Sequence, residues 1–235
     1  MKHIRKNAEP QGFIDWKSEN WASIEAKHND GATGALLWDI FPSSRSAINA
    51  PNEYSKADLR TAITSEQFYI CCYCMAGIKA NLLDTKMEHF LPKETYKPTQ
   101  VFDYQNLLAA CNGGEKTRPI ELSCDSEKGS KSPNQVIIIS PLQEDCEKHF
   151  EYKENGEIVG LTDEGTATIE NLNLNCKRLI ILREKVLQTY VFDVWQEDME
   201  TIIEVENVIQ PYFDEGKYIL QPFCMAIASV LKCYP

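Results

Sequence analysis

Two sets of side chains in the middle of this 235-residue sequence could carry metal chemistry, and the first is a set of four cysteines, Cys71, Cys74, Cys111 and Cys124. Cys71 and Cys74 have the Cys-x-x-Cys spacing of a zinc knuckle, in which a tight turn directs two thiolates at one ion. Cys111 and Cys124 lie farther apart, so the loop between them must fold back to complete the ligand set. We therefore predict a structural zinc site, the alternative being four buried small apolar side chains.

The second set has the residue types needed to hydrolyse a phosphodiester. This reaction needs a base that deprotonates water and a cation that stabilises the charge developing on phosphate. His89 suits the first task because the pKa of histidine lies near neutrality. Glu88 and Asp125 offer oxygen ligands for Mg²⁺ or Mn²⁺, and Asn106 could orient His89 through its side-chain amide.

Each of these residues means little alone, but their order within the cysteine frame resembles that of the HNH, or ββα-metal, endonucleases. The motifs of this resemblance are Cys71-x-x-Cys74, Glu88-His89-Phe-x-Pro92, Asp103-x-x-Asn106-Leu-Leu, Cys111-Asn112-Gly and Cys124-Asp125-x-x-Lys128-Gly129. They cover roughly residues 60–135. Two features depart from the common pattern: Asp125 stands where many HNH enzymes have Asn or His, and the second cysteine pair is spread apart.

The resemblance implies a β-hairpin packed on a helix around one catalytic metal ion, Mg²⁺ or Mn²⁺, with a zinc site bracing this module. It implies that His89 is the general base, that Glu88 and Asp125 are ligands of the catalytic metal, and that Asn106 orients the base. It also implies that the four cysteines bind the structural zinc.

A weaker likeness, over nearly the whole chain, is to the HNH proteins encoded with retron and Septu-type antiphage systems. It rests on the opening Met1-Lys-His-Ile-Arg-Lys-Asn-Ala-Glu-Pro and on the stretch Ile169-Glu-Asn-Leu-Asn-Leu-Asn. This likeness implies that the protein works in antiviral defence, bound to an ATPase of the ABC or SMC-like kind.

The charge of the chain is unevenly distributed. A net charge of −11 argues against simple nucleic-acid binding, but residues 146–235 carry 16 acidic and 8 basic side chains, whereas residues 64–133 are nearly neutral. We expect the acidic part to dock the ATPase and the central part to meet phosphate. The basic candidates, whose alternative is a solvated loop surface, are Lys93, Lys97, Lys116, Arg118, Lys128 and Lys131.

The sequence predicts an α+β protein with three parts: an N-terminal segment (1–54), an HNH nuclease module (55–145), and a hairpin followed by helices (146–235). Capping and periodicity predict the elements in that order. They are a helix over 13–26, a loop over 29–51, a capped helix over 55–67, an extended segment over 68–73, a strand near 87–91, a short helix containing Asp125, a buried run at 136–141, a hairpin over 150–159, a short helix, a long helix over 177–208, and a final helix from Pro222.

The remaining features of the sequence concern the cellular compartment of the protein and the alternatives to the predicted function. With neither a signal peptide nor an apolar span of about 20 residues, we expect a cytoplasmic protein with no membrane contact. Reduced thiols are normal there, so we expect the other cysteines to be buried and unligated: Cys72, Cys146, Cys176, Cys224 and Cys233. The predicted function is metal-dependent cleavage of DNA, and the alternatives are an RNase, for example one that cuts tRNA, and a non-catalytic zinc-containing adaptor of the ATPase.

Overall fold

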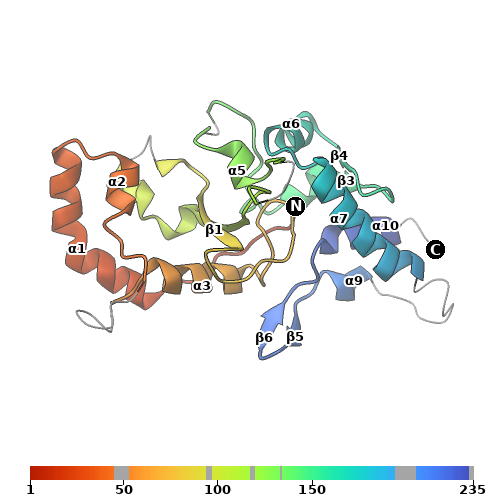
Figure 1. Ribbon diagram of the computed structural model, residues 1–235, viewed down its shortest axis with the longest axis horizontal. Helices are drawn as coiled ribbons and strands as arrows, with labels where there is room; N and C mark the ends of the chain where they lie inside the picture. Colours follow the sequence, from red (N-terminus) through yellow and green to blue (C-terminus); the bar gives the residue numbers. More distant parts are fainter. Residues whose placement is uncertain (45–52, 94–96, 117–119, 133, 194–204, 233–235) are drawn as a thin grey trace.

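The protein has a mixed α+β architecture, as the sequence predicts (Figure 1). The computed structural model describes residues 1–44, 53–93, 97–116, 120–132, 134–193 and 205–232. The helices are α1 Gln11–Asn29, α2 Gly34–Trp38, α3 Lys56–Glu66, α4 Pro98–Val101, α5 Asp125–Lys128, α6 Asp163–Asn171, α7 Lys177–Leu187, α9 Val205–Val208 and α10 Cys224–Leu231, with short turns of other helix types at Tyr104–Asn106, Cys146–His149 and Gln188–Asp193.

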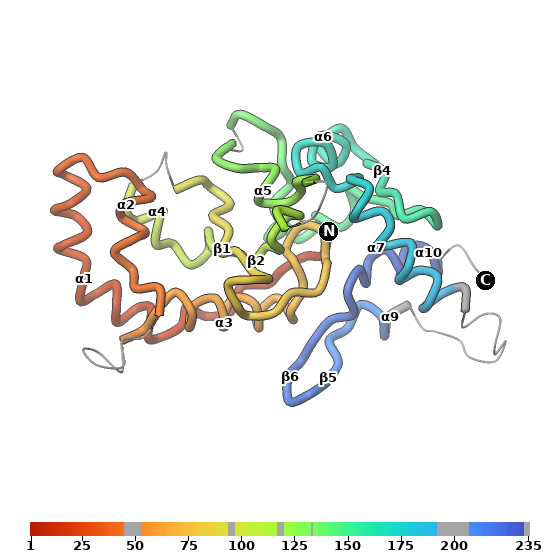
Figure 2. The backbone as a smooth tube through the Cα atoms, viewed as in Figure 1, coloured from red at the N-terminus to blue at the C-terminus, as the bar shows by residue number. Residues whose placement is uncertain are grey.

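The described strands pair as three separate two-stranded antiparallel sheets. Their members are β1 Thr85–His89 with β2 Leu107–Cys111, β3 Phe150–Tyr152 with β4 Ile158–Gly160, and β5 Tyr212–Asp214 with β6 Lys217–Ile219. Figure 2 shows the β1–β2 hairpin near the middle of the molecule, between the N-terminal helices and the C-terminal part.

The N-terminal helices enclose an aromatic cluster. The predicted helix over 13–26 is confirmed and is longer than expected, and its Phe13 and Trp16 pack on Phe41 with ring centroids 5.2 and 4.5 Å apart. The predicted loop over 29–51 is wrong in part, because α2 lies within it and Thr33 caps this helix. Residues 45–52 of that loop lie outside the described ranges.

Helix α3 carries the predicted capping box, with Ser55 and Asp58 bonding each other's backbone N–H groups. The extended segment predicted to follow it is wrong at its start. Phe68 and Tyr69 adopt left-handed φ angles of 51° and 61°, which end the helix in a tight turn. The chain then forms an isolated bridge between Ile70 and Gly77, and the cysteine knuckle lies inside this small loop.

The central β1–β2 hairpin is held against α3 by one glutamine. The side chain of Gln67 accepts a hydrogen bond from Ala109 N at 2.7 Å and donates one to Ala109 O at 2.8 Å. It also donates to Ile70 O at 3.0 Å. All five residues of β2 are buried. The hairpin contributes to both candidate sites, because β1 carries Glu88 and His89 and β2 ends at Cys111.

The C-terminal part contains two hairpins rather than the one predicted. The β3–β4 hairpin with its turn at Gly156, helix α6 and helix α10 are confirmed. The long helix predicted over 177–208 is described as helical to Asp193 and again in α9, while residues 194–204 lie outside the described ranges. The β5–β6 hairpin was not predicted. The buried run predicted at 136–141 contains buried Ile138 and Ile139 but no strand.

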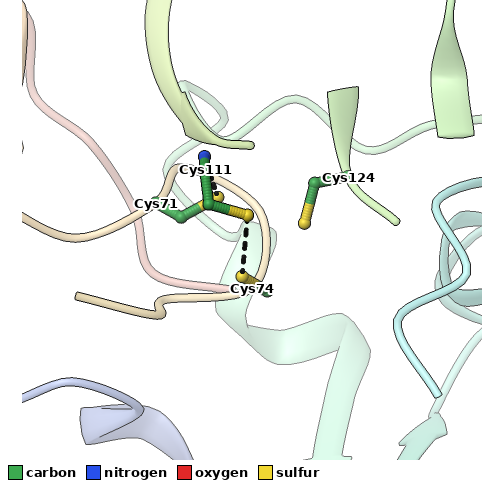
Figure 3. A group of neighbouring side chains, drawn as sticks. All are labelled: Cys71, Cys74, Cys111 and Cys124. Atoms are coloured by element: carbon green, nitrogen blue, oxygen red, sulfur yellow. Dashed lines mark hydrogen bonds between the residues drawn. The ribbon is translucent and has the colours of Figure 1, made fainter. Parts of the chain in front are cut away.

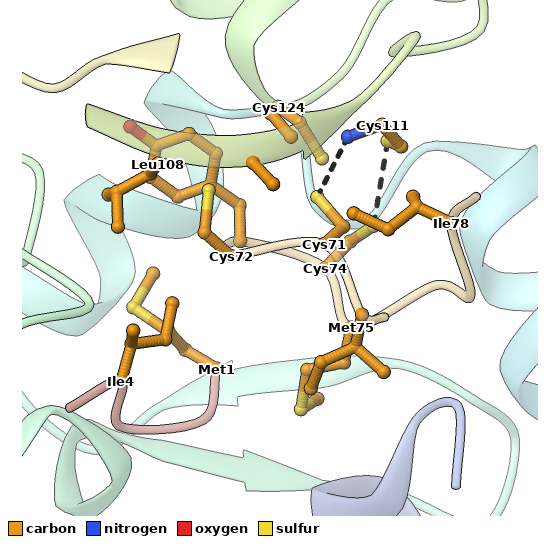
Figure 4. Close-up of a cluster of buried hydrophobic side chains, with 14 of the residues drawn as sticks. Met1, Ile4, Cys71, Cys72, Cys74, Met75, Ile78, Leu108, Cys111 and Cys124 are labelled. Atoms are coloured by element: carbon orange, nitrogen blue, oxygen red, sulfur yellow. Dashed lines mark hydrogen bonds between the residues drawn. The ribbon is translucent and has the colours of Figure 1, made fainter. Parts of the chain in front are cut away.

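The hydrophobic core passes beneath the cysteine knuckle (Figure 4). Met1 and Ile4 are buried in it beside Cys72, Met75 and Leu108. This packing brings the first residues of the chain under the centre of the molecule. Within the described ranges, every helix is too short or too polar to cross a lipid bilayer.

Candidate metal centre and catalytic cleft

The four predicted cysteines lie together in one buried cluster (Figure 3). Their sulfur atoms are all within 4.8 Å of one another, and Cys74 Sγ lies 3.8 Å from Cys111 Sγ. Zinc binds thiolate sulfur at about 2.3 Å, which places sulfurs at tetrahedral corners about 3.8 Å apart. The donor set and its spacing therefore fit a four-thiolate zinc site.

Two backbone hydrogen bonds help to bring these cysteines together from distant parts of the chain. Ser123 N donates to Gly113 O at 2.9 Å and closes the loop between Cys111 and Cys124. Gly113 has a φ of +61°, and a Cβ there would lie 2.4 Å from Ser123 O, so this close approach requires glycine. On its other side, Cys124 N donates to Leu172 O at 2.8 Å, so the C-terminal part also holds the cluster.

The thiols perturb one another's titration. Burial favours the neutral form of Cys71, yet hydrogen bonds from Cys111 and Cys124 hold the pKa of Cys71 well below its usual range. Hydrogen bonding with Cys111 raises the pKa of Cys74 and of Cys124 well above theirs. A cation bound among these groups would favour the ionised form of the cysteines that hold it.

The fifth cysteine of this region, Cys72, is buried in the core and is not a member of the cluster. Cys146, Cys176 and Cys224 are likewise buried and free. These four agree with the prediction, and Cys233 lies outside the described ranges.

Glu88 lies beside the cysteine cluster in the wall of a cleft of about 380 Å³ that is also lined by His89 and Asp125. Its Oε1 atom accepts hydrogen bonds from Tyr73 at 2.7 Å and from the ammonium of Lys128 at 2.5 Å. Burial raises the pKa of Glu88 well above its usual range, and the neighbouring carboxyl of Asp125 raises it further, while Lys128 opposes both. Two carboxyls this close favour a shared cation.

Asp125 sits in the first turn of α5, as predicted, and follows Cys124 directly. Its Oδ2 atom lies 3.9 Å from Lys86 Nζ. The ammonium of Lys86 also donates to Ser126 Oγ at 3.0 Å and pairs with Glu115. Asp125 is one-fifth exposed in its side chain, so it faces the cleft more openly than Glu88 does.

His89 ends β1 and is 7% exposed. Its Nε2 atom lies 3.0 Å from the carbonyl oxygen of Val101, and the ring of Trp38 packs edge-on with centroids 4.7 Å apart. Burial lowers the pKa of His89 to about 4, so the imidazole is neutral at pH 7. A neutral ring that donates Nε2–H to a carbonyl carries its lone pair on Nδ1, which can then accept a proton.

Asn106 fixes the backbone that follows His89. Its side chain accepts from Leu91 N at 2.7 Å and donates to Leu91 O at 2.9 Å, with a further bond to Gln100 O at 3.3 Å. The predicted contact was between this amide and His89 itself. Among the described contacts, the amide instead holds the chain two residues beyond His89, and Val101 holds the ring.

The predicted phosphate-binding lysines differ in their surroundings. Lys93 lines the cleft, and Lys97 and Lys131 are exposed. Lys128 is the exception, because it is 1% exposed and its ammonium also donates to His89 O at 2.9 Å. In this arrangement Lys128 neutralises Glu88 and is not presented to a phosphate.

Of the other basic candidates, Lys116 is exposed and donates to Leu83 O, and Arg118 lies outside the described ranges.

Four contacts to Glu88 and His89 were not predicted, and they come from Trp38, Tyr73, Val101 and Lys128. Only two of them carry a sequence signal. Tyr73 lies inside the Cys-x-x-Cys loop, and Lys128 follows Asp125 by one helical turn, which places both next to predicted site residues. Trp38 and Val101 approach His89 from remote segments, and nothing in the sequence around them indicates that they contact this residue.

Comparison with known proteins places the chain among named relatives. No family model matches the chain. An Escherichia coli protein named "Retron Ec83 putative HNH endonuclease" is 30% identical, with the match covering 80% of this chain and 79% of that protein. The Septu protein PtuB of Bacillus thuringiensis is 24% identical over 65% of this chain and 54% of its own length.

The similarity and the site define the class: this chain is an HNH endonuclease, an enzyme class that uses metal ions. Within that class it belongs to the retron and Septu type. Its cysteine cluster could hold a metal ion.

Proposed function

We propose that the protein hydrolyses phosphodiester bonds in DNA at the cleft lined by residues of β1 and α5, and that these two elements together with β2 constitute a ββα-metal module. The observation that carries this proposal is the meeting of Glu88, His89 and Asp125 in one cleft. In the proposal, Glu88 and Asp125 hold Mg²⁺ or Mn²⁺, while Cys71, Cys74, Cys111 and Cys124 hold a structural zinc that braces the module.

His89 is proposed to activate water. A neutral imidazole with its Nε2 atom engaged by Val101 O keeps Nδ1 free to accept a proton from a water molecule in the cleft. Asn106 acts as a positioning residue through the backbone of Leu91. When bound, the divalent cation supplies charge stabilisation for the phosphate and the leaving oxygen.

Residues around the cleft are proposed to receive the substrate. Lys93 lines it, and Lys97 and Lys131 are exposed on adjoining segments, so all three can neutralise phosphate. The retron and Septu relatives support a role in antiviral defence. We propose that the acidic residues of 146–235 dock an ABC or SMC-like ATPase of the same system, because their surplus of negative charge is unsuited to nucleic acid.

The test compares His89→Ala with His149→Ala in plasmid-nicking assays with Mg²⁺ or Mn²⁺, with and without a co-expressed ATPase. General base catalysis contributes about 10²–10⁴-fold, so we expect His89→Ala to lose at least 100-fold in rate while keeping its zinc content. His149 bonds Thr162 outside the cleft, so its variant should retain activity. Undiminished nicking by His89→Ala would refute the assignment.

The same assay separates the two alternatives when it includes RNA substrates. Cleavage of RNA, for example tRNA, in place of plasmid would assign the cleft to an RNase. Failure of the wild-type chain to cut either substrate, with the ATPase present, would favour a non-catalytic zinc-containing adaptor.

A further inference from the structure

A second and larger depression, of about 1190 Å³, shares no lining residue with the catalytic cleft. Its walls are the N-terminal segment, the end of α3, and the β5–β6 hairpin. The hairpin extends away from the body of the molecule (Figure 1) and is attached to the end of α3 by a hydrogen bond from Leu220 N to Phe68 O at 3.0 Å. We call this depression the hairpin groove.

The hairpin groove is basic in a protein whose net charge is −11. Its described lining includes the cations Lys2, Arg5 and Lys217 but a single acidic side chain, Glu66. That carboxylate is already paired with the buried ammonium of Lys6 at 2.5 Å, and Lys2 is paired with Glu147, outside the lining, at 2.8 Å. Arg5 is exposed, and no described residue forms an ion pair with it. The positive charge that the groove offers a ligand therefore comes from Arg5 and Lys217.

Aromatic rings lie among these cations. Tyr69 and Tyr218 line the groove, and Lys217 Nζ lies 4.7 Å from the centroid of the Tyr69 ring. Tyr218 is 60% exposed and is flanked by Phe213, 64% exposed, with centroids 5.3 Å apart. These two opposite rings of the β5–β6 hairpin form an exposed apolar surface beside the cations, a feature found at interaction sites.

The wall that carries Tyr69 is also conformationally strained. Phe68 and Tyr69 both have left-handed φ angles, which are unfavourable for residues with large side chains. Strained backbone persists where the surrounding structure fixes it, and it clusters at ligand sites. The strain here presents a ring to the groove rather than to the core, since Tyr69 is only partly buried.

We propose that the hairpin groove binds a single-stranded nucleic acid, with Arg5 and Lys217 contacting phosphates and Tyr218 stacking on a base. Proteins that hold single strands combine a positive groove with exposed aromatic side chains in this way. The volume exceeds the roughly 300–1,000 Å³ of small-molecule sites, which favours an extended ligand. An acidic peptide would use the cations but would leave the aromatic rings uncovered.

The test measures fluorescence anisotropy of labelled single-stranded DNA and RNA 20-mers with the full chain and no added divalent cation. With two cations on phosphates, the slope of log affinity against log salt concentration should be about −1.4. Affinity should therefore fall about sevenfold between 50 and 200 mM salt. The DNA and RNA arms show which strand is preferred.

Two double variants with the same net charge provide the decisive comparison. Arg5→Glu with Lys217→Glu reverses the groove, whereas Lys148→Glu with Lys153→Glu reverses exposed lysines outside its lining. We expect the groove variant to bind at least tenfold more weakly and the control less than twofold. Tyr218→Ala, an exposed change that should not affect folding, should weaken binding at least fivefold.

Equal weakening in both double variants would mean that only the overall charge matters and would overturn the proposal. Absence of binding by the wild-type chain would also overturn it and would leave a protein segment as the occupant of the groove. Neither result bears on the nicking assay of His89→Ala, so the groove and the nuclease proposal can fail separately.

Discussion

The cysteine cluster and the proposed catalytic cleft are adjacent but differ in almost every physical respect. The cluster presents four identical soft ligands, all buried, with their sulfurs within 4.8 Å of one another. The cleft presents two carboxyls and an imidazole, opens to solvent, and balances its charge with Lys128. A closed set of four ligands leaves a metal ion no free position and serves structure, whereas an open set leaves room for water and phosphate.

Two links connect the cysteine cluster with the cleft, one a hydrogen bond and the other a pair of consecutive residues. Tyr73 lies within the cysteine knuckle and bonds Glu88, and Asp125 follows Cys124 at the start of α5. Damage to the cluster should therefore spread to the cleft. Damage to the cleft should leave the cluster intact, and this asymmetry can be tested.

The largest effect is expected from Cys74→Ala. Structural zinc contributes about 10–16 kcal/mol in small zinc domains, whereas whole proteins are stable by about 5–15 kcal/mol. We expect the variant to lose zinc and cooperative thermal unfolding, and hence all nuclease activity. Circular dichroism and metal analysis of the purified protein measure both losses.

Cys72→Ala is the matched control for that variant, because Cys72 is a buried thiol of the same loop outside the cluster. It should keep stoichiometric zinc and lose only about 1 kcal/mol of unfolding free energy. Equal loss of zinc in the two variants would contradict the assignment of the cluster.

A smaller and reversible effect is expected from brief chelation. Treatment with EDTA should remove the divalent cation from the open cleft and abolish cleavage, while the zinc within four buried thiolates remains. Adding Mg²⁺ or Mn²⁺ should restore the rate without refolding. Persistence of cleavage in EDTA, or loss of zinc at the same rate as activity, would show that the two regions do not differ in this way.

The smallest effect is expected from Tyr73→Phe, which removes one hydrogen bond to the Glu88 carboxylate. Bonds to charged groups contribute about 1.5–3 kcal/mol, so the divalent-cation concentration for half-maximal cleavage should rise about tenfold. Zinc content should not change. Titration of the cleavage rate with Mg²⁺ or Mn²⁺ measures the shift.

Tyr104→Phe provides the matched control for Tyr73→Phe. Tyr104 is also a buried tyrosine that bonds a buried carboxylate, that of Glu66 at 3.0 Å, but it is not in the cleft. Its loss should cost a similar amount of stability without altering the cation requirement. An equal shift of the half-maximal cation concentration in both variants would show that Tyr73 contributes only to the general stability of the fold.

Local sequence signals were sufficient for much of the architecture. The Ser55 capping box, the turn of the β3–β4 hairpin and the first turn of α5 each depend on residues within a few positions of one another. Cys71 and Cys74 were recognisable by their spacing for the same reason. Such features are fixed by short-range sterics and hydrogen bonding and can be predicted without the rest of the chain.

Features that depend on distant segments could not be predicted in this way. The closure of Cys111 on Cys124 depends on Gly113 and on Leu172. The orientation of His89 depends on Trp38 and Val101. The β5–β6 hairpin carries little alternation of polar and apolar residues, since both strands are partly or fully exposed, so its pattern did not distinguish it from a loop.

The order of the cysteines along the chain has a consequence for biosynthesis. Cys71 and Cys74 emerge from the ribosome first, but Cys124 emerges later, and its backbone is fixed by Leu172 from a segment made later still. The arrangement seen in the structure is therefore complete only after the segment that carries Leu172 has been made. Because Cys124 and Asp125 are consecutive, closing the cysteine cluster also positions the Asp125 carboxylate, so the proposed zinc site and the proposed catalytic cleft would form together, late in synthesis.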